Sequence, residues 1–207
     1  ANTQLTRPGL RDVPALFEAE NAPSRQELAS AIVFAANPHK AAEAFAVRIN
    51  NSAVRLSKQL KSKVKELITG KKGVIDKVHA VYGYVQKSLN HIEISVAVAV
   101  ETAVCIPRTV EEIFMTHYAN PVEKSVLLHA MLKIAGVKSE IAFSTDTEFT
   151  VPVLPVQFGR CGVIVTLNRK PVWLDTTSDF TKAKNIRPSN EIAVAKRNGF
   201  KIMPAQA

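Results

Sequence analysis

A clearly delimited helix signal in the middle of the chain constrains the fold more than any other feature. Asn120 is a suitable N-cap, Pro121 suits the first helical position, and Glu123 favours the positive end of the helix dipole. Apolar residues follow at helical spacing, and Gly136 suits the left-handed conformation that ends many helices. We therefore expect a helix that runs from Pro121 to Ala135.

The hydrophobic pattern changes from helical spacing to alternation after this helix, which indicates strands. The stretches KSEIAFST, GVIVTLN and KPVWLDTT predict three strands, and the turn NRKP predicts that the last two form an antiparallel hairpin. Upstream, helical patterns cover residues 40–69, 73–90 and 109–117, and HIEISVAVAV predicts one strand between the last two. Helices therefore precede the sheet, which predicts an α+β domain with segregated layers.

The same patterns divide the chain into three parts. Residues 1–38 are expected to be a helical lead-in, and residues 39–186 are expected to form the core. Residues 187–207, which are polar apart from a short apolar run, are expected to be a C-terminal tail.

Positive charge is concentrated in one segment. The net charge is +9, and residues 40–89 hold eleven Lys and Arg residues against three Asp and Glu residues. This segment is either an ordinary solvated helix surface or a face for an anionic partner such as anionic lipid or an acidic glycan. Nucleic acid is not favoured, because no aromatic side chain interleaves the charges between Arg48 and Val81. The candidate anion-binding residues are Arg55, Lys58, Lys61 and Lys65.

Several classes of protein are not indicated. The sequence contains no run of 18 apolar residues, so no transmembrane helix is expected, and no export signal is visible. The five histidines and two cysteines never occur at metal-ligand spacing, and no glycine cluster follows a strand, so we expect no metal or cofactor. Cys105 and Cys161 form no disulfide framework, and either a single bridge between them or a buried Cys161 thiol fits the sequence.

Several motifs in order resemble the bacterial transglutaminase-like branch of the papain-type cysteine hydrolases. They are KVHAVYGYVQKSLNHI, then PRTVEEIFMTHYANPVEKSVLLHAMLKIAGVKSEIAF, then CGVIVTLNRKPVWLDTT, which together cover about half of the chain. The resemblance implies a papain-like core with a helical N-terminal part and a C-terminal antiparallel sheet. It also implies a periplasmic or cell-surface location. The chemistry of that family is acyl transfer or amide hydrolysis by a Cys at the start of the central helix, a strand His and an orienting Asp.

The resemblance assigns these three catalytic positions to Pro121, Gly162 and Asp175. Proline offers neither a thiol nor a backbone N–H, and glycine offers no base, so two of the three roles have no side chain to perform them. We therefore predict a catalytically inactive relative that binds a protein, peptide or glycan, or serves as a scaffold. The residues expected to flank the former cleft are Tyr118, Phe158, Cys161 and Trp173.

Two alternatives stay open. One is a cysteine-dependent amide hydrolase or acyltransferase in which Cys161 acts as a relocated thiol beside a histidine. The candidate bases are His79, His91, His117 and His129, and His129 is expected to be exposed because it lies off the apolar stripe of the central helix. The other alternative is an anion-binding protein that acts through the basic helical segment.

Overall fold

The computed structural model of the 207-residue chain describes residues 38–52, 56–92, 107–145, 149, 153, 157–177, 191–196 and 198–204. The predicted lead-in lies outside these residues, apart from its last position, as do Arg55, Cys105 and most of the strand expected after His91. Within the described ranges, no helix has the length and apolar character needed to cross a bilayer.

Five helices form the first layer of the described domain. They are α2 (Pro38–Ser52), α3 (Lys58–Ile68), α4 (Val74–Ser88), α6 (Val110–Thr116) and α7 (Pro121–Ile134). The single pattern predicted over residues 40–69 is two helices, and they separate at the polar INNSAV stretch. Gly70, which follows the end of α3, has a φ of +75°. Thr109 and Glu112 form a capping box at the start of α6.

Helix α7 has the ends that its sequence predicts. The Asn120 side chain accepts a hydrogen bond from the Glu123 N–H, and the Glu123 carboxylate accepts one from the Asn120 N–H. Gly136 ends the helix region with a φ of +75°. Most of α7 is buried on every side, which is expected of a helix in the centre of a domain rather than at its surface.

The second layer is an antiparallel sheet in which the strand order is β5-β4-β3-β6-β7. The turn between β4 and β5 places Asn168 and Arg169 at positive φ, as a tight two-residue hairpin turn requires. A separate parallel pair joins the short strands β1 and β2. The strands are β1 (Asn90–His91), β2 (Tyr118–Ala119), β3 (Ser139–Ser144), β4 (Arg160–Leu167), β5 (Lys170–Asp175), β6 (Glu191–Lys196) and β7 (Gly199–Pro204).

The expected C-terminal tail is corrected by this sheet. Strands β6 and β7 lie within residues 187–207, and β6 pairs with β3 in the register Phe143 to Ala193. These strands complete the core, so this part of the chain is not an appendage. The sequence EIAVAK is too short to identify a strand by itself, because its pairing depends on β3, which lies about fifty residues upstream.

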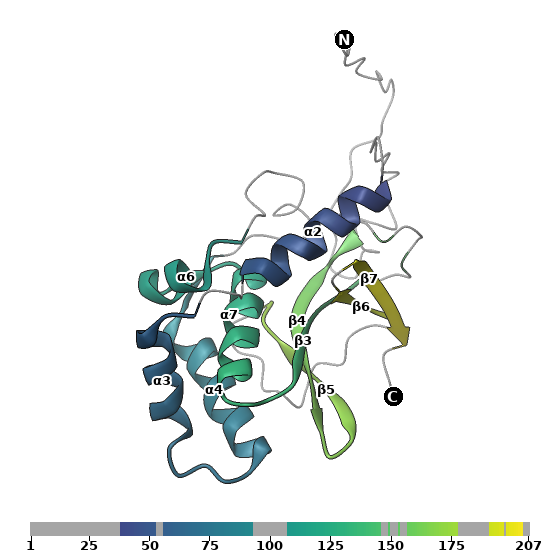
Figure 1. Ribbon diagram of the computed structural model, residues 1–207. Helices are drawn as coiled ribbons and strands as arrows, with labels where there is room; N and C mark the ends of the chain where they lie inside the picture. The colour runs from purple at the N-terminus through teal and green to yellow at the C-terminus, as the bar shows by residue number, and fades with distance from the viewer. Residues whose placement is uncertain are drawn as a thin grey trace, which may run out of the picture. The chain divides into compact units, whose positions relative to one another are not determined.

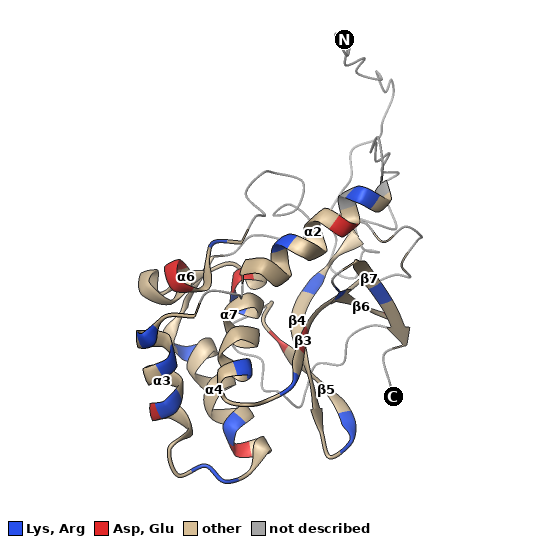
Figure 2. Ribbon diagram, viewed as in Figure 1, with Lys and Arg blue, Asp and Glu red and all other residues tan. Residues whose placement is uncertain are grey.

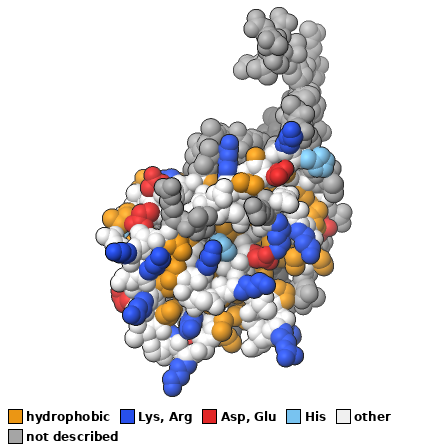
Figure 3. All heavy atoms as spheres, in the orientation of Figure 1, with side chains coloured by type: hydrophobic (Ala, Val, Ile, Leu, Met, Phe, Trp, Pro, Cys, Tyr) orange, Lys and Arg blue, Asp and Glu red, His pale blue; other side chains and the backbone are white. Residues whose placement is uncertain are grey.

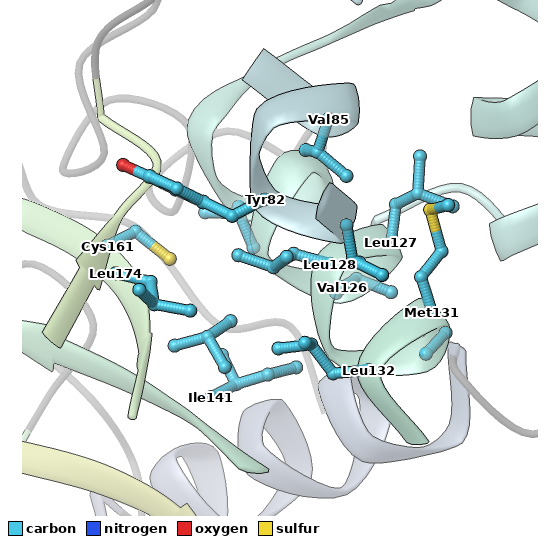
Figure 4. Packing of buried hydrophobic residues seen from close by; sticks show 14 of the residues in the cluster. Tyr82, Val85, Val126, Leu127, Leu128, Met131, Leu132, Ile141, Cys161 and Leu174 are labelled. Atoms are coloured by element: carbon cyan, nitrogen blue, oxygen red, sulfur yellow. The ribbon is translucent and has the colours of Figure 1, made fainter. Parts of the chain in front are cut away.

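The central helix α7 lies between the sheet and helices α3, α4 and α6, whereas α2 packs directly on the sheet. Helix α7 contacts β3 and β4, α4 packs against α7, and α2 contacts β6 and β7 (Figure 1). Tyr82 and Val85 of α4 and Cys161 and Leu174 of the sheet surround the apolar side chains of α7 (Figure 4). The predicted fold class is confirmed as helices followed by a C-terminal antiparallel sheet, and the arrangement brings the N-terminus of α7 to the strand ends.

Candidate functional site

The end of strand β5, which carries Asp175, reaches the N-terminus of α7. The Thr176 hydroxyl donates a hydrogen bond to the Pro121 carbonyl over 3.0 Å, which ties the end of β5 to the first turn of the helix. Gly162 of β4 pairs directly with Asp175 of β5. Pro121 therefore lies beside the end of β5, but Gly162 and Asp175 face away from α7, because their neighbours Cys161 and Leu174 pack with that helix.

The Asp175 carboxylate is held by several donors. Its Oδ1 accepts a hydrogen bond from the Thr177 N–H at 2.7 Å, and its Oδ2 accepts one from the Trp173 indole N–H at 3.2 Å. The Arg160 guanidinium lies 3.8 Å from the same Oδ2. On the backbone side, the Tyr82 hydroxyl donates to the Asp175 carbonyl at 2.6 Å. Asp175 is 3% exposed, so the bonds within the protein satisfy a carboxylate that water hardly reaches.

The Trp173 ring fills the space in front of Gly162. A Cβ atom on Gly162 would lie 2.7 Å from Cζ2 and 2.8 Å from Cε2 of Trp173, and 2.6 Å from the Leu174 carbonyl oxygen. Such distances are well inside van der Waals contact, so position 162 accepts no side chain in this arrangement. The ring that excludes the side chain is the same ring that donates to Asp175.

On the helix side of the sheet, Cys161 belongs to a small buried cluster of hydroxyl groups. Its Sγ lies 3.0 Å from the Ser125 Oγ, and the Ser125 Oγ lies 2.6 Å from the Thr176 Oγ1. Cys161 is a free thiol, and burial raises its pKa to about 12. A neutral thiol is a weak nucleophile, so this environment holds Cys161 in its unreactive form.

His129, one of the histidines considered as a base for Cys161, contacts a different residue. His129 Nδ1 lies 3.0 Å from the Ser139 Oγ, at the start of β3. The expectation that His129 is exposed is wrong: the residue is only partly accessible, because α7 is covered on nearly all sides. Burial lowers the pKa of His129, with a smaller contribution from Lys133. Among the described residues, the hydrogen-bond partners of the Cys161 thiol and the Ser125 hydroxyl include no imidazole.

The residues expected to line a cleft separate into two groups. Tyr118 is 44% exposed, and its ring stacks on the Arg108 guanidinium with 4.4 Å to the ring centroid. Phe158 is fully buried and stacks on Phe143 with 4.1 Å between centroids, inside an aromatic cluster. The expectation that Phe158 flanks an open groove is therefore corrected, as is that for Cys161, which is also fully buried. Tyr118 alone of the four is exposed.

A brace around Glu123 fixes the entrance to the helix, and the sequence did not identify it. Arg108 Nε donates to Glu123 Oε1 at 2.7 Å, and Nη2 donates to Oε2 at 2.9 Å. A second bond from Nη2 reaches the Tyr118 carbonyl at 2.7 Å. Glu123 was recognised only as a helix-capping residue, because an ion pair across 15 residues leaves no local sequence signal.

Ser125 and Thr176 are also absent from the predicted site, and no spacing rule would have found them. No group of described residues has the composition of a metal site. A hollow of about 480 Å³ lies between α2 and β7, where His39, Glu43 and Lys201 line it together with Phe200 and Ile202. None of the predicted cleft residues lines this hollow.

Comparisons with known proteins reveal likeness in structure only. No protein-family model matches the chain, and no curated protein matches it in sequence. The fold is similar to that of a "putative protease" from Parabacteroides distasonis, at 17% identity and a TM-score of 0.62, over 80% of this chain and 31% of that chain. A "putative cysteine protease" from Cytophaga hutchinsonii is similar at 11% identity and a TM-score of 0.44, over 75% and 46% of the two chains. The chain therefore spans less than half of each of these proteins, and the first similarity establishes a protease-like fold.

Proposed function

We propose that the protein is a catalytically inactive module on a transglutaminase-like core, and that it acts by binding or scaffolding. The protease-like fold supports the core, and the side chains at the N-terminus of α7 support the loss of covalent chemistry. A proline occupies the position from which the family's thiol attacks. Binding is the function that remains when a fold is kept without its nucleophile.

The packing of Trp173 on Gly162 carries this proposal. In the resemblance, position 162 belongs to the imidazole that exchanges protons with the thiol and donates to the Asp. Here position 162 has no side chain, and the Trp173 ring that packs on it donates its own N–H to Asp175 at 3.2 Å. An indole N–H does not titrate at neutral pH and has no lone pair in the ring plane to accept a proton. The substitute therefore keeps the structural bond and loses the base.

The alternative of a relocated thiol receives little support from the same geometry. Cys161 is fully buried, its pKa is about 12, and its neighbours are hydroxyl groups rather than a base. An acyl donor would have to enter a packed core to reach it.

The accessible part of the site is its outer edge, and this is where we place the ligand. Tyr118 is 44% exposed and Met115 is 55% exposed, and both lie on the segment that leads into α7. An aromatic ring stacked on Arg108 beside a flexible thioether forms a surface suited to a peptide or protein partner.

A peptidyl electrophile directed at thiols and hydroxyls tests the proposal. Intact mass after incubation of the folded Cys105→Ser variant should show no adduct. Adduct formation on Cys161 or Ser125 that disappears in a His129→Gln variant would establish a working dyad and overturn the inactive assignment.

A further inference from the structure

The exposed face of α3 carries a regular row of lysines. Lys58, Lys61 and Lys65 follow one another at spacings of three and four residues, so their side chains share one side of the helix. Leu60 and Val64 are fully buried on the opposite side. Packing of this apolar side into the core therefore turns the lysines outward.

The row continues into the turn at the end of the helical hairpin. Lys71 and Lys72 are exposed in the turn that joins α3 to α4. We refer to Lys58, Lys61, Lys65, Lys71 and Lys72 as the lysine row. Blue segments follow α3 and its connection to α4 in Figure 2, and blue side chains gather on this side of the molecule in Figure 3, clear of the grey atoms in that view.

Two aliphatic side chains project beside the end of the lysine row. Val74 is 50% exposed and Ile75 is 39% exposed, in the first turn of α4. The buried residues of α4 begin one turn later, at Val78. The two side chains form a small exposed apolar patch next to Lys71 and Lys72 in the sequence.

The positive field of this surface is only weakly opposed. Residues 56–92 contain eight lysines, and their acidic residues are Glu66 and Asp76, which leaves a net charge of +6. The Glu66 carboxylate is already paired with Lys63 at 2.8 Å, and Lys63 is not part of the row. The acid on α3 is therefore engaged by another lysine, and Asp76 lies in the first turn of α4, next to Val74 and Ile75.

We propose that the tip of the α3–α4 hairpin docks on an anionic lipid surface. The lysine row would lie against the headgroup phosphates, and Val74 and Ile75 would enter the boundary with the acyl chains. Clusters of four to eight basic residues on an amphipathic helix are a known signature of such binding, and apolar side chains beside them add to it. This interaction is separate from the proposed ligand surface around Tyr118, so either can fail without the other.

The same features favour lipid over nucleic acid. The row consists of lysines alone, whose compact charges suit diffuse attraction to phosphates but lack the planar fork that reads bases. No aromatic ring lies within the row to stack on a base. Val74 and Ile75 would add no binding free energy on a phosphate backbone, whereas aliphatic side chains are suited to a lipid boundary.

Cosedimentation with phosphatidylcholine vesicles, prepared with and without phosphatidylglycerol, tests the proposal on the full chain. We expect binding only to the anionic vesicles, with affinity that falls as salt is added. The variant K58Q/K61Q/K65Q should bind on the order of 100-fold more weakly, because each lysine near an anionic surface contributes about fivefold. The matched control K133Q/K138Q/K201Q removes the same charge from exposed positions outside the row, and it should lose much less affinity.

A second variant separates lipid from other polyanions. V74S/I75S keeps every charge and should weaken vesicle binding by roughly tenfold, since two aliphatic side chains no longer enter the acyl boundary. Its binding to soluble polyphosphate or to DNA should be unchanged. Failure to bind anionic vesicles at low salt would overturn the proposal, and so would vesicle binding that V74S/I75S leaves intact. Binding to DNA or polyphosphate without binding to vesicles would identify a different anionic partner and equally reject the lipid surface.

Discussion

Substitution of Gly162 by alanine is the simplest perturbation of the proposed site. A single methyl group placed there meets the Leu174 carbonyl oxygen at 2.6 Å and two Trp173 ring carbons at 2.7 and 2.8 Å. The carbonyl belongs to the paired strand β5, so it cannot rotate away as a flexible side chain would. The φ of Gly162 lies outside the left-handed region, so the effect comes from contacts and not from backbone strain.

The expected cost follows from these contacts. Overpacking of a tight interior costs about 1–3 kcal/mol, and the lower chain entropy of unfolded alanine returns about 0.4–1 kcal/mol. We therefore expect Gly162→Ala to lower the free energy of unfolding by about 1–2 kcal/mol, which corresponds to a fall in Tm of roughly 2–8 °C in a domain of this size.

Gly83→Ala is the matched control, because it adds the same methyl group inside α4, where no neighbouring atom lies within 4 Å. It should stabilise the protein by roughly 0.5–1 kcal/mol, since alanine is the better helix former. Urea unfolding of both variants measures the two changes. A Gly162→Ala protein as stable as the wild type would show that Trp173 does not pack on position 162.

Three further predictions concern the surroundings of α7. In a Cys105→Ser background, Cys161 should react with a thiol reagent up to pH 9 only as fast as the protein opens, because burial raises the pKa of its thiol to about 12. Rapid labelling of the folded state would contradict the burial. Arg108→Ala should lower the free energy of unfolding by roughly 2–4 kcal/mol in urea, because it leaves the Glu123 carboxylate buried without its cation; a loss below about 0.5 kcal/mol would reject the brace. Burial lowers the pKa of His129 from 6.5, so the unfolded chain binds a proton more readily and the free energy of unfolding should fall as the pH drops through 6.5. His129→Gln should reduce this fall, and an unchanged pH profile would argue against the lowered pKa of His129.

Local signals in the sequence predicted the helical half of the domain well. The ends of α6 and α7 depend on residues three positions apart, such as Asn120 and Glu123, so adjacent letters suffice to identify them. The hairpin of β4 and β5 is likewise local, because its turn holds two residues at positive φ. The C-terminal strands β6 and β7 were missed, since a short strand is defined by a partner that is distant in sequence.

The sequence predicted which elements lie next to each other at the site but not the contacts there. The end of β5 does lie beside Pro121, because the order of elements along the chain carries their arrangement. The contacts that decide the chemistry are different in kind. These contacts depend on three-dimensional packing, which no spacing in the sequence encodes. They are the Trp173 ring on Gly162, the ion pair of Arg108 with Glu123 and the burial of Phe158.

Trp173 is the only tryptophan in the chain, so its indole gives a single, assignable amide-type signal in a nitrogen–proton NMR spectrum. The ring is 7% exposed and donates to Asp175 at 3.2 Å, so the account predicts one sharp indole resonance with slow hydrogen exchange, which shifts and exchanges faster in Asp175→Asn. A rapidly exchanging indole N–H that ignores Asp175→Asn would mean that Trp173 neither packs on Gly162 nor bonds to Asp175, and the proposal of an inactive site would lose the observation that carries it.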